Sequence, residues 1–148
     1  MSTYFDMGDE TLWNPSSGAG RLFLRQVEVF EAELGLPSGI GQGKYPGDPD
    51  TLEVDPAVYA EFACRLVDWH CRAGHAVILA LSEGFVATVV ALARRAGIEV
   101  GMPEPGFGAV GGGVRRDVQV PGNPGGDSAV VGSALDSRAR ELDRWMAR

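Results

Sequence analysis

The run AVILALSEGFVATVVALA, residues 76–93, decides the fold of this chain, because its eighteen residues include only three polar side chains. A long apolar run without proline predicts one central helix that other elements cover. One of the three polar residues is Glu83, near the middle of the run. A lone ionised carboxylate costs several kcal/mol to bury unless it is paired or protonated. Glu83 therefore points more strongly than any other residue to a site or a partner.

Two stripes of side chains follow this central helix, which we expect over residues 75–96. One stripe is made of small residues and the other of bulky residues, both at helical spacing. The small stripe contains Ala76, Ala80, Gly84, Ala87 and Ala91, and the bulky stripe contains Val77, Leu81, Phe85 and Leu92. Because small side chains let a second backbone approach closely, we expect the helix to be sandwiched between its neighbours.

Periodicity and end signals predict three further helices. An apolar stripe at i, i+4, i+7 and i+11 marks a helix over residues 20–34, which Gly35 ends. An Asp-Pro pair, typical of an N-cap and a first helical position, opens a helix over residues 55–73. The last helix is expected over residues 133–147, with its apolar residues on one face.

Outside the helices, residues 4–13 have the pattern of a short hairpin around the turn Met7-Gly8-Asp9-Glu10. Residues 36–54 are rich in glycine and proline and are predicted to form a loop. We therefore expect a mainly α fold, a small three- to four-helix domain with a minor N-terminal β-hairpin.

Three parts of the chain differ in composition. Residues 1–100 are expected to form the helical core domain with its hairpin, and residues 133–148 the C-terminal helix. Between them, residues 101–132 are expected to be a Gly/Pro-rich linker or lid, because thirteen of the 26 residues from 101 to 126 are glycine or proline. Within that segment, residues 114–120 have the composition of one short strand.

The charge of the chain is negative and uneven. Its formal charge is −7 at pH 7 and its pI about 4.7, which argues against nucleic acid as a general partner. Residues 1–61 hold eleven acidic side chains against three basic ones. This acidic N-terminal half is either a solvated face or a contact surface for a basic partner.

The N-terminal sequence MSTYFDMGDE lacks the basic and apolar stretches of a signal peptide. The two cysteines lie seven residues apart and make no disulfide framework, so we expect a reduced, cytoplasmic protein. The apolar run is nearly long enough to span a bilayer, but Glu83 at its centre favours a core helix. No membrane partner is expected.

Two sets of residues match functional motifs without the required context. Residues 106–111 read GxGxxG, but prolines precede them and more glycine follows, whereas a dinucleotide site needs a strand before and a helix after. Cys64, Asp68, Cys71 and His75 would share a face of an unbroken helix and are ligand types that zinc accepts. A glycine interrupts that helix before His75, and buried cysteines behave as small apolar residues. We therefore expect neither a cofactor nor a metal ion.

Glu83 has two candidate partners, His70 and His75. If the second and central helices fold back antiparallel, His70 and Glu83 approach each other. A buried carboxylate–imidazole pair can act as general acid and base. It can equally be a structural pair, and a protonated Glu83 can instead bond the hydroxyl of Ser82, Thr88 or a tyrosine.

The stretches TLWNPSSGAGRLFLRQVEVFEAELGLPSGIG, residues 11–41, and HAVILALSEGFVATVVALARRAG, residues 75–97, resemble a small actinomycete protein family of unknown function. The resemblance covers about residues 4–97. It implies no activity, because no activity is attached to that family.

Two classes of function remain. The favoured one is a protein-binding module, either a homo-oligomer or an immunity-type protein that contacts another protein through the acidic N-terminal half. The wide apolar surface of the second and central helices favours self-association as a two-fold dimer. The alternative is a small helical enzyme or small-ligand binder, in which Glu83 acts with His70 or His75 as acid and base and the ligand lies near Glu83. The sequence leaves enzymatic activity undecided.

Overall fold

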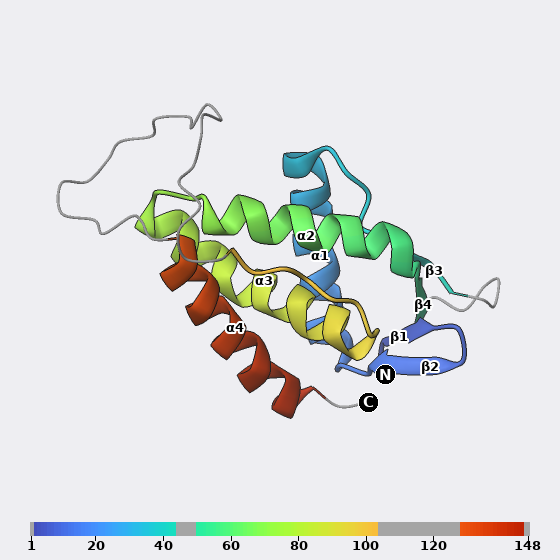
Figure 1. Cartoon of the computed structure of the whole chain (residues 1–148). Helices are drawn as coiled ribbons and strands as arrows, with labels where there is room; N and C mark the ends of the chain where they lie inside the picture. The colour runs from blue at the N-terminus through green and yellow to red at the C-terminus, as the bar shows by residue number, and fades with distance from the viewer. Residues whose placement is uncertain (1, 44–49, 104–127, 147–148) are drawn as a thin grey trace.

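The computed structural model describes residues 2–43, 50–103 and 128–146, and it has the mainly α fold that the sequence predicts. Within this part of the chain, α2, α3 and α4 lie side by side, α1 passes behind α2 and α3, and a small sheet gathers at one end (Figure 1). The strand predicted at residues 114–120 and most of the predicted linker lie outside the described residues.

The four helices of the described residues run over Ser17–Leu34 (α1), Pro56–Cys71 (α2), Ala76–Arg95 (α3) and Ser128–Trp145 (α4). Their ends follow local chemistry. Gly35 ends α1 in the left-handed conformation at φ 65°. Asp55 accepts the backbone N–H groups of Ala57 and Val58 and so caps α2. Helix α4 begins five residues earlier than expected, so part of the predicted linker is helical.

The N-terminal hairpin is confirmed, but it belongs to a larger sheet. Strands Tyr4–Met7 (β1) and Glu10–Trp13 (β2) pair antiparallel, and Ile40–Gln42 (β3) and Thr51–Val54 (β4) complete the order β2-β1-β4-β3. Strand β4 runs parallel to β1, with Phe5 opposite Leu52. The prediction of a loop over residues 36–54 was therefore wrong at β3 and β4.

The physical reason for this error lies in strand length and pairing distance. Strands of three or four residues are too short to show a reliable alternation of apolar side chains. The parallel pairing also joins segments more than forty residues apart. Gly39, one of the residues that suggested a loop, adopts φ 78° and lies so close to Tyr59 N that a Cβ atom would come within 2.9 Å. The glycine thus marks the contact between sheet and helix α2.

A continuous row of aromatic rings connects the sheet to the helices. Phe5 and Trp13 stack in the sheet, and both meet Phe23 of α1 edge-on. Phe23 then contacts Phe85 of α3. The row continues to Phe30 of α1, which stacks on Phe85, and to Trp69 of α2. Ring contacts of this kind contribute about 0.5–1.5 kcal/mol each beyond area burial, so the sheet is part of the core.

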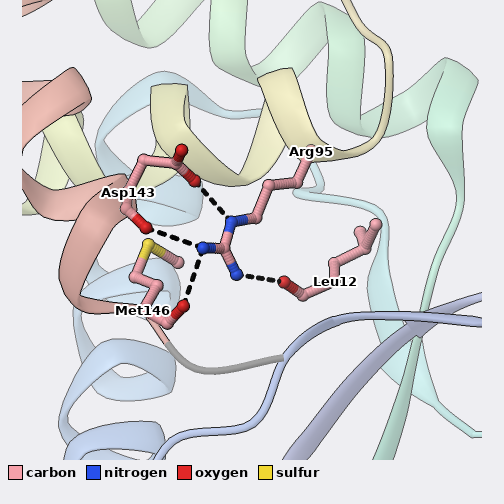
Figure 2. Close-up of polar contacts among 4 residues, drawn as sticks. All are labelled: Leu12, Arg95, Asp143 and Met146. Atoms are coloured by element: carbon pink, nitrogen blue, oxygen red, sulfur yellow. Dashed lines mark hydrogen bonds and ion pairs between the residues drawn. The ribbon is translucent and has the colours of Figure 1, made fainter.

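Arg95, at the end of α3, fastens the sheet end of the molecule (Figure 2). Its guanidinium donates to the Leu12 carbonyl of β2 at 2.8 Å, and at 2.7 Å each to the carbonyls of Asp143 in α4 and of Met146, the residue that follows α4. It also pairs with the Asp143 carboxylate. Because only 9% of its side chain is exposed, Arg95 holds the last turn of α4 against β2 and α3 with little competition from water.

Candidate functional site

The environment of α3 changes along its length. From Phe85 to Ala93 every residue except Thr88 is buried, whereas Ser82 is the one buried residue between Ala76 and Gly84. The helix is therefore enclosed in its second half and partly open in its first half. The expectation of a helix sandwiched between its neighbours agrees with residues 85–93, whereas the described elements leave residues 76–84 partly open.

Glu83 lies at this boundary and is half-buried rather than enclosed. The three hydroxyl groups that could have bonded it on α3 or in the core all donate elsewhere. Ser82 Oγ donates to Ile78 O at 2.7 Å, Thr88 Oγ1 to Gly84 O at 2.8 Å and the buried Tyr59 hydroxyl to Val89 O at 3.1 Å. The carboxylate therefore keeps access to solvent, and the cost of burial that first drew attention to it is only partly incurred.

His70 is the more enclosed member of the predicted pair. It lies in the last turn of α2, is 2% exposed, and its Nδ1 is 2.8 Å from Ser82 Oγ on α3. The Ser82 hydroxyl has one hydrogen, which it donates to Ile78 O, so it accepts from His70 Nδ1–H. In the neutral ring the unprotonated nitrogen is then Nε2. This bond joins the end of α2 to the open half of α3.

The electrostatics of His70 follow from its burial. Burial lowers the pKa of His70 below its ordinary value, and the negative charge of Glu83 opposes that shift by raising it. The net shift of the His70 pKa is downward, so the imidazole is neutral at pH 7. The structure thus brings His70 and Glu83 close enough to interact electrostatically, as the antiparallel packing of the two helices required.

His75 has a different position and a different task. It is the N-cap of α3, where its Nδ1 accepts the backbone N–H of Val77 at 3.2 Å. Eight residues separate it from Glu83, which corresponds to about 12 Å along a helix. The structure therefore does not bring His75 to Glu83. Sequence reasoning missed this capping role, although a polar residue after a helix-breaking glycine is its usual signal.

The four possible zinc ligands are dispersed. Cys64 is exposed and Cys71 is buried, and Asp68 forms an ion pair with Arg72 at 2.8 Å. Burial and, less strongly, the charge of Asp68 raise the pKa of the Cys71 thiol to about 11, so the thiolate form that zinc binds is disfavoured. Within residues 2–43, 50–103 and 128–146, no cluster of three or more such side chains could hold a metal ion.

The apolar surface that the sequence analysis assigned broadly to the second and central helices is exposed on the first half of α3. Leu81 is 76% exposed and Val77 57% exposed, and Ala76, Ala80 and Gly84 beside them are exposed as well. A Cβ atom on Gly84 would meet nothing within 4 Å. We call these five residues the open α3 face. Hydrophobic residues surround the helix on all sides in sequence, so the pattern alone did not show which of them lack a cover.

The acidic N-terminal half is partly used inside the molecule. Glu31 accepts Ser38 N at 2.6 Å and Glu53 accepts Gly8 N at 2.8 Å, while Asp6 accepts the Thr11 hydroxyl at 2.8 Å. Asp55 caps α2, as described above. Several of these acids therefore stabilise turns and helix ends, which accounts for part of the acidic charge without a partner.

Among the described residues, α3 is one helix that is long and apolar enough to cross a membrane, with a mean hydropathy of 2.2. Half of that segment is buried inside the protein. A core helix meets the same criteria of length and composition, so this finding is weak evidence for a membrane span.

Comparison with known proteins places the chain at the level of a family. No curated protein and no solved structure matches it. One family model does match, over residues 1–148, and therefore extends beyond residues 4–97, which carried the resemblance seen in the sequence. The described helices, the sheet and the open α3 face all fall within the matched residues. The chain thus belongs to DUF6086, a family of unknown function.

Proposed function

We propose that this chain is a protein-binding module and that the open α3 face is the surface through which it associates with a second copy. One observation carries the proposal: Leu81 and Val77 lie exposed at 76% and 57% on a helix in which every residue from 85 to 93 except Thr88 is buried. Covering a Leu or Val side chain contributes about 1.5–3 kcal/mol. The two residues therefore offer a favourable free energy of association that the described part of the chain leaves unused.

The chemistry of the face suits a second copy of the chain. None of its five residues is ionisable, so pairing two such faces buries no charge. The surrounding molecule carries a formal charge of −7, so two copies repel each other at long range. Salt screens this repulsion, and self-association should strengthen as ionic strength rises. A basic partner bound to the acidic N-terminal half would show the opposite dependence on salt.

The size of the face limits the strength of the contact. A standard protein interface uses about 20–30 residues on each side, far more than the five of the open α3 face. We therefore expect weak, concentration-dependent association in the micromolar range or above.

Sedimentation velocity at increasing protein concentration tests the proposal. The wild-type chain should change from a 15.7 kDa monomer towards a dimer, and Leu81→Glu should remove this change. Leu22→Glu is the matched control, because Leu22 is 62% exposed on α1 and receives the same charge away from the face. A wild-type chain that stays monomeric up to about 1 mM, the concentration at which an association of about 4 kcal/mol is half complete, contradicts the proposal.

Other occupants of the face have distinguishable outcomes. Binding of the monomer to phosphatidylcholine vesicles that is lost in Leu81→Glu and kept in Leu22→Glu would replace the second copy by a lipid surface. Loss of dimerisation in both variants would instead attribute the effect to added negative charge and remove the face from the argument.

The alternative function, a small helical enzyme or ligand binder, is supported by the electrostatic interaction between Glu83 and His70. It is weakened by the burial of His70 and by the bond of its Nδ1 to Ser82. For this alternative to hold, a ligand must reach Nε2, and its binding should shift the His70 imidazole resonances in NMR spectra. Glu83→Gln should then weaken that ligand without unfolding the chain.

A further inference from the structure

We propose that two copies pair their α3 helices antiparallel about a two-fold axis that passes between Ala80 and Leu81. This inference rests on the proposed self-association and adds its geometry. In this arrangement Val77 packs on Gly84 of the second copy, and Leu81 packs on Ala80 of the second copy. Each bulky side chain of one face thereby meets a small residue of the other.

The spacing of the open α3 face supports a helix–helix contact. Val77, Leu81, Gly84 and Thr88 follow one another at intervals of four, three and four residues, which keeps them on one side of the helix. All four are exposed or half-exposed. Because Ala80 and Gly84 add almost no side-chain volume, a second helix can approach to the short end of the usual interaxial range of about 8–10 Å.

Size complementarity selects this register over the nearby ones. A two-fold axis at residue 79 would place Val77 against Leu81 of the second copy, so two bulky residues would meet while Gly84 would lie outside the contact. A parallel pairing would place each residue against its own copy, with Val77 on Val77 and Gly84 on Gly84. Both arrangements leave a bulge beside a gap, which costs dispersion contacts and buried area.

The charges next to the face agree with the same register. Glu83 is half-buried and borders Ala80 and Gly84. With the axis between Ala80 and Leu81, Glu83 lies opposite Ile78 of the second copy rather than opposite the second Glu83. The two carboxylates are then about 7.5 Å apart along the helix axis and keep access to solvent. The described face therefore pairs with itself without placing like charges directly opposite each other.

An exchange of size between two positions tests the register. Gly84→Val alone places a valine against Val77 of the second copy and should weaken self-association at least about tenfold, the effect of overpacking a contact. Val77→Ala alone removes packing and should also weaken it. The double variant Val77→Ala/Gly84→Val restores a small residue opposite a bulky one and should recover association to within a few-fold of the wild type.

We expect these variants to keep the fold of the monomer, so that a change in their self-association reports on the contact between the two copies. Gly84 is exposed and a side chain there meets nothing within 4 Å, and Val77 is more than half exposed. At low concentration, the melting temperatures of these variants should therefore match that of the wild type or rise slightly. In Gly84→Val, valine has a higher helix propensity than glycine, and in Val77→Ala, alanine has a higher helix propensity than valine. A variant with a clearly lower melting temperature is replaced by Gly84→Ala or Val77→Thr at the same position.

The outcomes separate the register from the proposed function. Recovery in the double variant supports the antiparallel pairing, because only there does residue 77 face residue 84 of the second copy. Losses that simply add in the double variant, while Leu81→Glu still abolishes dimerisation, overturn the register and leave self-association standing. If none of these substitutions changes dimerisation, both the register and the proposed role of the open α3 face are overturned.

Discussion

The two halves of α3 have nearly the same apolar composition and very different surroundings. The second half carries Phe85, Val89 and Leu92, which α1, α2, α4 and the sheet enclose. The first half carries Val77 and Leu81 in the same kind of sequence, and both stay exposed. The hydrophobicity of a segment therefore indicates how much free energy its burial would contribute, whereas the neighbouring elements determine whether it is buried.

The largest expected effect is on the free energy of unfolding when a leucine is replaced by alanine in each half of α3. Leu92→Ala should lower the free energy of unfolding by about 3–5 kcal/mol, because Leu92 is fully buried and its loss leaves a cavity. Leu81→Ala should change it by no more than about 0.5 kcal/mol. Chemical denaturation at a concentration low enough to keep the chain monomeric measures both. Equal losses in the two variants would show that the first half is covered.

The next effect concerns the closed end of α3. Arg95→Met should destabilise the fold by about 2–4 kcal/mol, because three carbonyl groups and the Asp143 carboxylate lose their common donor. Arg94→Met is the control. Arg94 also pairs with an acid of α4, Asp136, but it is more exposed, so its loss should cost less than about 1 kcal/mol. Hydrogen exchange should further show α4 opening selectively in Arg95→Met. Similar stability of the two variants would remove the special role of Arg95.

A third prediction uses the acid sensitivity of the boundary between the halves. The pKa of His70 is lowered in the folded chain, so between that value and the unfolded value of about 6.5 the unfolded chain binds more protons. The contribution of the neutral His70 side chain to the free energy of unfolding should therefore be fully present above pH 6.5 and decrease as the pH falls below that value.

The chain has two histidines, which supplies the control for this pH dependence. His75→Asn keeps a good N-cap residue on α3 and should retain the loss of stability between pH 7 and 5. His70→Gln should lose that part of the pH profile. If His70→Gln keeps the same profile as the wild type, another group is responsible and the neutral, buried state of His70 is incorrect.

The smallest effect is expected at Glu83. Because the carboxylate is half-buried, Glu83→Gln should change the free energy of unfolding by less than about 1 kcal/mol. The same substitution removes the negative charge that raises the pKa of His70, so the NMR-monitored pKa of His70 should fall further. An unchanged His70 titration would mean that the two side chains do not interact. A destabilisation of several kcal/mol would restore the view of Glu83 as a buried structural carboxyl.

Local signals predicted most of the helical architecture. The Asp55-Pro56 start and Gly35 end lie where the structure has them, because capping depends on a few neighbouring backbone groups. The second pair of strands was missed, since β4 becomes a strand by pairing with β1, far away in sequence. The candidate pair of Glu83 and His70 was predicted from antiparallel packing, whereas the bond of His70 to Ser82 depends on the register between α2 and α3, which no local pattern states.

By itself the sequence determined that residues 76–93 form a long apolar helix, since its periodicity and its glycine boundaries depend only on neighbours along the chain. Only the tertiary structure decided that Phe85 and Leu92 are enclosed while Val77 and Leu81 face solvent. Burial depends on where α1 crosses α3 and on how Arg95 joins the end of α4 to β2. Those are contacts between distant segments, and the same apolar side chain stabilises the fold where such a contact covers it and remains available to a partner where none does.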